Sequence, residues 1–105
     1  MVIRLYMVSH PVENAEVLAR QLVEKKLAAC VHLLPKGISI YQWDGRICEE
    51  EELLLLIKTA ADANKLKSAI LNEHPHDCPE IISIEVTDGH RDYLEWVIQS
   101  TKETP

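Results

Sequence analysis

The chain opens with a pattern of apolar residues that predicts a β-strand followed by a helix. Residues 2–8 carry apolar side chains on both faces, as in a central strand, and Ser9-His10-Pro11 is expected to end it. The next apolar residues recur at intervals of three and four and predict an amphipathic helix: Val12, Ala15, Leu18, Ala19, Leu22, Val23 and Leu27. Glutamates early in this segment and lysines late in it agree with the helix dipole.

The middle of the chain predicts a long β-hairpin. Residues 29–34 have a strand pattern, Pro35-Lys36-Gly37 interrupts it as a bulge or kink, and the strand resumes over residues 38–43. Asp44-Gly45 is a strong hairpin signal, because a type I′ turn needs positive φ at both central residues. Residues 46–59 form the returning arm of this hairpin.

The returning arm has an unusual composition. Four consecutive glutamates, Glu49 to Glu52, precede a solid apolar run from Leu53 to Ile57. A hairpin of this length cannot be fully covered by a chain of 105 residues, so we expect part of it to pair with another subunit. The glutamates either gather cations or form an exposed arm whose charge blocks unwanted edge pairing. Because adjacent strand residues point to opposite faces, at most two of them share a side.

The last third of the chain predicts a helix, a strand and a terminal helix. Residues 60–73 form the first helix, which His74-Pro75 ends, and residues 80–87 form a strand. Ile82, Ile84 and Val86 share one face of that strand, and the helix over residues 91–101 is expected to turn four residues inward: Tyr93, Leu94, Val97 and Ile98. The β-α-β-β-α-β order plus a C-terminal helix predicts one α+β domain over residues 1–105, a ferredoxin-like antiparallel sheet with helices on one face.

Composition excludes several function classes. The net charge of −6 argues against nucleic-acid binding. No segment approaches the ~18 apolar residues of a membrane span, and the first residues do not resemble a signal peptide, so we expect a cytoplasmic protein. The three cysteines, Cys30, Cys48 and Cys78, include no CxxC pair and are expected to stay reduced.

The best candidate for metal chemistry is the segment from His74 to Cys78. His74, His76, Asp77 and Cys78 offer two imidazoles, a carboxylate and a thiolate, which suit copper or zinc. Alternate positions of an extended stretch point to one side, so His74, His76 and Cys78 would converge if the flanking prolines keep the loop extended. The other interpretation is a solvated helix-to-strand loop with one buried cysteine. Cys30 and His32 form a weaker pair of the same kind if residues 29–34 are a strand; otherwise Cys30 packs in the core or in a subunit interface and His32 is exposed at an edge.

A small polar ligand is the second possibility. Lys58 follows a continuous apolar strand and Glu80 follows a proline at a strand start, so near a cleft between subunits they would bind a ligand or pair with each other. Tyr41 and Trp43 are aromatic residues suited to that cleft or to interface packing. Motifs of common enzyme classes, such as a nucleophile elbow, a phosphate-binding glycine loop or HExxH, do not occur, so we do not expect an enzyme.

Several segments together resemble the CutA family, also called divalent-cation tolerance proteins. They span nearly the whole chain in order: Leu27-Ala28-Ala29-Cys30-Val31, Ser39-Ile40-Tyr41-Gln42-Trp43-Asp44-Gly45, Ile57-Lys58-Thr59, His74-Pro75, Pro79-Glu80-Ile81 and Tyr93-Leu94-Glu95-Trp96. The resemblance implies a ferredoxin-like fold and a tight homotrimer built through the long hairpin, with an architecture similar to the PII signalling proteins. It also implies a link to copper tolerance and divalent-metal binding, and animal members are linked to anchoring a cholinesterase.

The chain departs from the family pattern near the candidate metal segment. Where the family usually has Tyr after His-Pro, this chain has His76, and it has Cys78 just before Pro-Glu. The metal site proposed for some members uses a Cys late in the first strand and two adjacent His, and here those positions are Val8, Glu73 and His74. Only His74 carries over. We therefore expect a trimeric divalent-cation tolerance protein that binds copper or another divalent ion, or alternatively a PII-like sensor or adaptor for a small ligand or protein partner.

Overall fold

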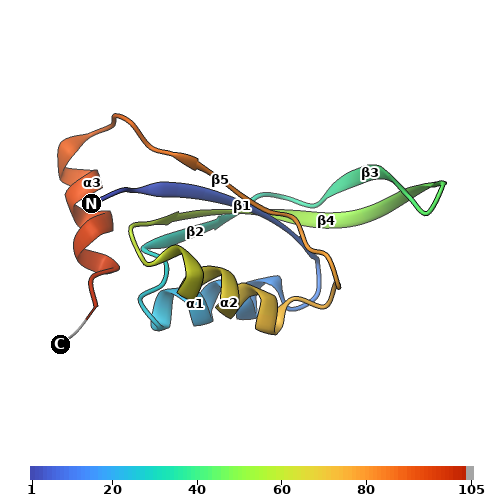
Figure 1. The fold of residues 1–105 in the computed structure, drawn as a ribbon, viewed down its shortest axis with the longest axis horizontal. Coiled ribbons are helices and arrows are strands. Elements are labelled where there is room, and N and C mark those ends of the chain that lie inside the picture. Colours follow the sequence, from blue (N-terminus) through green and yellow to red (C-terminus); the bar gives the residue numbers. More distant parts are fainter. Residues whose placement is uncertain (104–105) are drawn as a thin grey trace.

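The computed structural model describes residues 1–103, and its strands and helices follow one another in the predicted order. The elements are β1 (Arg4–Pro11), α1 (Ala15–Glu24), β2 (Cys30–Leu33), β3 (Gly37–Trp43), β4 (Arg46–Thr59), α2 (Ala63–Glu73), β5 (Ile81–Glu85) and α3 (Arg91–Ser100). The predicted interruption separates β2 from β3, and both pair with β4. The result is the ferredoxin-like α+β arrangement with an added C-terminal helix (Figure 1).

All strand pairs are antiparallel, and the strand order is β2-β4-β1-β5, with β3 paired to the outer half of β4. Helices α1 and α2 cover one face of the sheet, and α3 lies across the end nearest the N-terminus (Figure 1). The β3–β4 hairpin projects beyond this body as an arm, which gives the molecule extents of 46 × 27 × 22 Å. Asp44 and Gly45 at its tip have φ of 54° and 75°, which confirms the prediction that both turn residues adopt positive φ.

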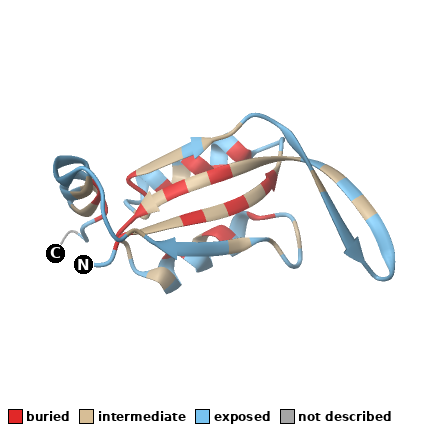
Figure 2. Cartoon of the chain, turned by 90° about the horizontal axis from the view of Figure 1, so that it is seen from above, coloured by how far each residue is buried: buried red, intermediate tan, exposed pale blue. Residues whose placement is uncertain are grey.

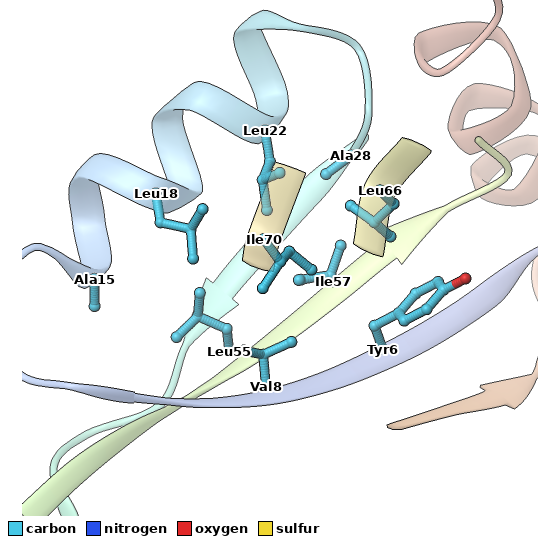
Figure 3. Packing of buried hydrophobic residues seen from close by; sticks show 10 residues of the cluster. All are labelled: Tyr6, Val8, Ala15, Leu18, Leu22, Ala28, Leu55, Ile57, Leu66 and Ile70. Atoms are coloured by element: carbon cyan, nitrogen blue, oxygen red, sulfur yellow. The ribbon is translucent and has the colours of Figure 1, made fainter. Parts of the chain in front are cut away.

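The core lies between the sheet and the helices α1 and α2. Strand alternation turns Tyr6, Val8, Leu55 and Ile57 toward the helices, and Figure 3 shows how they meet side chains from both: Leu18, Leu22, Leu66 and Ile70. Leu55, Ile57, Leu66 and Ile70 are fully buried. At about 1.5–3 kcal/mol for each buried aliphatic side chain, this layer is the main source of stability for the framework that carries the arm.

A buried threonine fastens the end of β4. The Thr59 hydroxyl donates to the Leu27 carbonyl at 2.7 Å and accepts from the Ala61 N–H at 2.9 Å. The N–H of Ala60, the residue between Thr59 and Ala61, donates to the Thr101 hydroxyl at 3.2 Å, and this bond joins the end of β4 to the end of α3. These bonds satisfy backbone groups that burial would otherwise leave unpaired.

Several element boundaries differ from the predictions. Strand β1 continues through Ser9-His10-Pro11, because a terminal proline loses only the last ladder bond and His10 turns into the core. Helix α2 begins at Ala63 rather than at residue 60, since the Asp62 side chain accepts from the Lys65 N–H and caps it. The first helix and β5 are likewise shorter than predicted, Ala15–Glu24 and Ile81–Glu85.

Helices α1 and α2 lie on one face of the sheet, and the opposite face is left open (Figure 2). The side chains on this open side are largely apolar. Ile82 and Ile84 share it as predicted, yet they are 53% and 54% exposed because no element of the described residues covers them. They stand opposite Met7 and Leu5 of β1, and Leu54 and Leu56 of β4 extend the same face. We name this set, Leu5, Met7, Leu54, Leu56, Ile82 and Ile84, the open face.

Helix α3 covers the end of the sheet with a narrow strip. Val97 is buried, and Leu94 and Ile98 are half-buried, as predicted. Tyr93 was expected to turn inward but is 40% exposed, and its ring lies 5.5 Å from that of Trp96. The prediction that Tyr93 turns inward was wrong. Helix α3 contacts only the end of the sheet, so one narrow stripe of apolar side chains is enough to cover that contact.

Candidate metal centre

A cleft lies where the arm leaves the body of the protein. Its volume is about 820 Å³, and it is bounded by β3 and β4 on one side and by the loop between α2 and β5 on the other. The lining residues relevant to chemistry are Tyr41, Trp43, Glu50, Glu52, His76, Asp77, Cys78 and Glu80. Four of them are carboxylates, and neither lysine nor arginine lines the cleft, so it attracts cations.

Three side chains in this cleft can present donors to one ion. Glu50 and Glu52 are alternate residues of β4 and therefore point to the same face, and His76 approaches them from the loop. One donor atom from each lies within 4.8 Å of the others, and all three residues are half-buried. His76 Nε2 lies 3.6 Å from Glu50 Oε2, so imidazole and carboxylate already face each other.

Tyr41 fixes one of these carboxylates. Its hydroxyl donates to Glu50 Oε1 at 2.5 Å across the β3–β4 ladder. The hydrogen bond to Glu50, with smaller contributions from neighbouring negative groups, raises the pKa of Tyr41 to about 12. Tyr41 therefore stays protonated and holds Glu50 by one oxygen, and the other oxygen faces His76.

His74 is the residue that positions the loop. Its Nε2 donates to the Ser9 carbonyl at 2.7 Å, and its Nδ1 accepts from the His76 N–H at 3.1 Å, so both ring nitrogens are engaged. The ring is buried and lies 4.8 Å from that of His10. Burial lowers the pKa of His74, in keeping with a neutral imidazole. The structure thus places His74 behind the cleft, where it orients His76.

The other predicted metal ligands line the cleft but do not join the cluster. The described residues offer one group of three convergent donors, Glu50, Glu52 and His76, rather than the expected set of His74, His76 and Cys78. Cys78 is exposed, and Asp77 is exposed beside it. The loop is held by His74 and is not a uniformly extended stretch, so its alternate side chains do not converge.

The predicted ligand residues divide between two places. Tyr41, Trp43 and Glu80 line the cleft, where Glu80 accepts from the Ser9 hydroxyl at 3.1 Å. Lys58 lies on the open side of the sheet, with its Nζ 3.7 Å from Cys30 Sγ. Within one chain the structure does not bring Lys58 and Glu80 together, because Lys58 stands opposite Leu5 and Cys30 in the ladders; their predicted meeting at a cleft between subunits stays a prediction.

The sequence analysis considered Glu49 to Glu52 only as a group that gathers cations or stays exposed, and it did not join Glu50 and Glu52 to His76. Strand alternation does indicate that Glu50 and Glu52 share a side. The approach of His76 to these glutamates depends on pairing between distant segments. Pro11 of β1 stands opposite Glu52 of β4, and Ser9, two residues before Pro11, accepts the hydrogen bond from His74 that holds the α2–β5 loop. A local sequence pattern therefore does not predict that His76 lies beside Glu50 and Glu52.

The donor set fits a borderline metal ion. Two carboxylates and one imidazole leave a coordination position open, as in exchangeable or catalytic zinc sites, and they also suit Cu²⁺. A hard ion such as Ca²⁺ prefers six to eight oxygens, more than these three residues supply. No helix within residues 1–103 is long and apolar enough to cross a bilayer.

The fold and the cleft define a class: a ferredoxin-like α+β protein with a long projecting hairpin and a cation-attracting cleft at its base. The family model described as CutA1 divalent ion tolerance protein matches residues 3–100 of the chain. The chain therefore belongs to the CutA1 family.

Named relatives agree with this assignment. The Divalent-cation tolerance protein CutA of Thermus thermophilus is 44% identical over 90 residues, which cover 85% of this chain and 87% of that protein. Protein CutA of Homo sapiens is 43% identical over 84% of this chain, which spans 50% of the human protein's length.

Solved structures give the same result. CutA1 from Oryza sativa superimposes with a TM-score of 0.94 at 34% identity, covering 99% of this chain and 97% of that one. The PII-like protein CutA from Nostoc gives a TM-score of 0.86 at 37% identity, covering 97% and 98%.

Proposed function

We propose that this protein binds a divalent transition-metal ion, Cu²⁺ or Zn²⁺, through Glu50, Glu52 and His76, and that this binding is its part in divalent-cation tolerance. The observation that carries the proposal is the convergence of the three donor atoms within 4.8 Å. The names of the relatives support the class of ligand, since they are called divalent-cation tolerance proteins.

The site is suited to reversible capture. Three protein ligands leave a position for water or for a ligand from another molecule, and the cleft is open to solvent on one side. The ion would neutralise two carboxylates that otherwise repel each other, while Tyr41 keeps Glu50 in place. Asp77 and Cys78 line the same cleft, and we propose them as sources of a fourth donor after a rearrangement of the loop.

Competitive titration with a chromophoric chelator tests this function. Wild-type protein is expected to withdraw one Cu²⁺ or Zn²⁺ per chain, and the Glu50→Gln/Glu52→Gln variant is expected to lose that saturable binding. Glu49→Gln/Glu51→Gln is the matched control, since it removes the same charge from the same strand but from the opposite face. Equal loss in both double variants would mean diffuse electrostatic attraction and would contradict the site.

We propose further that the protein is a homotrimer whose subunits cover the open face and the arm. The open face and three apolar residues on one face of the arm support this: Ile38, Ile40 and Ile47, which are 65–71% exposed. Contiguous apolar surface of this kind marks an interface. Light scattering is expected to report three times the 12.0 kDa chain mass, whereas a folded particle of one chain mass would overturn the proposal.

A PII-like small-molecule sensor is the second candidate function. The cleft volume of about 820 Å³ and the two aromatic residues Tyr41 and Trp43 favour it, because pockets for small ligands combine such volume with aromatic walls. The surrounding carboxylates favour a cationic ligand over a nucleotide. Thermal shift with metabolites distinguishes the two: an organic ligand that raises the melting temperature of the Glu50→Gln/Glu52→Gln variant supports a sensor independent of metal.

A further inference from the structure

A cysteine and a lysine outside the cleft form a contact that the proposed function does not use. Cys30, the first residue of β2, stands directly opposite Lys58 of β4, and Cys30 Sγ lies 3.7 Å from Lys58 Nζ. The contact is partly buried. None of the ion pairs among residues 1–103 involves Lys58, so no carboxylate holds its amine away from the sulfur.

The framework keeps these two side chains together. The Ala29 N–H donates to the Lys58 carbonyl at 2.9 Å, and Thr59 anchors the end of the same strand, so neither backbone can drift. Tyr93 of α3 lies near Cys30 and is partly exposed; burial, and then the neighbouring Cys30, raise the pKa of Tyr93. A nucleophilic sulfur and an amine are thus held near contact distance by structure that serves the fold.

The other two cysteines lack this arrangement. Cys48 lies in the cleft, where its Sγ donates to the Arg46 carbonyl at 3.8 Å. Cys78 is exposed in the loop between α2 and β5. Within the described part of the chain, Cys30 is the one whose sulfur has a side-chain amine as hydrogen-bond partner.

We propose that Cys30 and Lys58 form a reversible sulfur–nitrogen cross-link when the protein meets hydrogen peroxide. Peroxide oxidises the Cys30 thiol to a sulfenic acid, and the second peroxide oxygen leaves as water. The Lys58 amine then attacks that sulfur, the S–N bond forms, the S–O bond breaks and a second water departs. The ammonium form of Lys58 gives its extra proton to solvent.

This sulfenamide would connect β2 to β4 covalently and would protect Cys30 from irreversible oxidation to the sulfinic acid. A thiol reductant reverses the step, because its thiolate attacks the sulfur and releases the lysine amine. The site would therefore act as a modification switch at the end of β2 nearest α3, away from the cleft. Peroxide is a small molecule, so a half-buried sulfur in an assembled protein stays within its reach.

Mass spectrometry of the peroxide-treated protein tests the proposal. A Cys48→Ser/Cys78→Ser background removes the competing thiols and leaves Cys30 unchanged. The intact chain is expected to become lighter by two hydrogen atoms, to yield a peptide joining Cys30 to Lys58, and to recover its mass with dithiothreitol. Lys58→Arg keeps the positive charge but removes the primary amine, and it is expected to lose the cross-linked peptide and to accumulate sulfinic acid at Cys30.

The outcomes separate the proposal from simple oxidation. A mass loss that persists in Lys58→Arg, or a Cys30 sulfenic acid that dimedone traps fully with no cross-link in the background protein, would overturn it. Circular dichroism before treatment establishes that each variant is folded, and the conservative Lys58→Arg change keeps the test available if Cys30 itself tolerates no substitution.

Discussion

The two histidines of the loop should respond differently to mutation, because one faces the cleft and the other orients it. His76 presents an imidazole to Glu50 and Glu52, whereas both ring nitrogens of His74 are engaged by protein groups. The informative pair of variants is His76→Ala and His74→Gln. Glutamine places an amide nitrogen near the position of Nε2, so it keeps a donor for the Ser9 carbonyl.

The size of the effect follows from the number of ligands. Structural zinc sites with four ligands bind with about 10–16 kcal/mol, or about 2.5–4 kcal/mol for each ligand. Removal of one ligand of three is therefore expected to weaken metal binding by about 10²–10³-fold. His76→Ala should show this loss, while His74→Gln, which keeps a donor to the Ser9 carbonyl but loses the bond from the His76 N–H, should weaken binding less.

The stability of the fold should show the opposite order. His74 is buried, and the His74→Gln variant loses the acceptor for the His76 N–H. This loss is expected to lower the free energy of unfolding by about 1–3 kcal/mol, because that donor is left without its partner. His76 is half-exposed, so His76→Ala should change the unfolding free energy little. Chelator competition measures the affinity, and urea unfolding of metal-free protein measures the stability.

One result would refute this reasoning. If His74→Gln weakens metal binding as much as His76→Ala while its unfolding free energy stays at the wild-type value, then His74 is a ligand. The buried, doubly bonded imidazole described above would then not be the state that binds metal.

Three further predictions concern the fold and the assembly. Burial lowers the pKa of His74 below its ordinary value of 6.5. The stability that the neutral imidazole contributes is therefore complete above pH 6.5 and is lost as the pH falls toward the lowered pKa of the folded protein. Urea unfolding between pH 7.5 and 5 should show this decline in the free energy of unfolding, and His74→Gln should make the pH dependence flatter. Thr59→Val leaves two partly buried backbone groups, the Leu27 carbonyl and the Ala61 N–H, without this partner and should cost about 1–3 kcal/mol in urea unfolding, whereas an unchanged midpoint would contradict the role of Thr59. Ile82→Asp on the open face should reduce the mass seen by light scattering, while Val17→Asp, at an equally exposed position on α1, should not.

Much of the fold was predictable because its signals are local. Alternating apolar residues and the repeat at three and four identify the strands and helices, and Asp44-Gly45 identifies the arm by the φ values that its turn requires. Boundaries failed where a side chain made a specific contact, as when Asp62 capped α2 three residues after its predicted start. His10 also misled the prediction, since its burial depends on the helices that pack over β1.

The site was predictable only in part. The residue types of the loop indicate metal chemistry, and His76 does line the cation-attracting cleft. Its proposed partners come from β4, and their approach depends on the register of β1 with β4 and on the bond from His74 to Ser9. Such pairing between distant segments is set by the whole sheet, so no short stretch of sequence specifies it.

The most direct test of the metal site is anomalous diffraction from a crystal soaked in Zn²⁺, recorded at the zinc edge. We expect one anomalous peak per chain within bonding distance of Glu50, Glu52 and His76, with the His74 ring still facing Ser9. A peak held by Cys78 and a rotated His74, or no peak in the cleft of a fully soaked crystal, would contradict it.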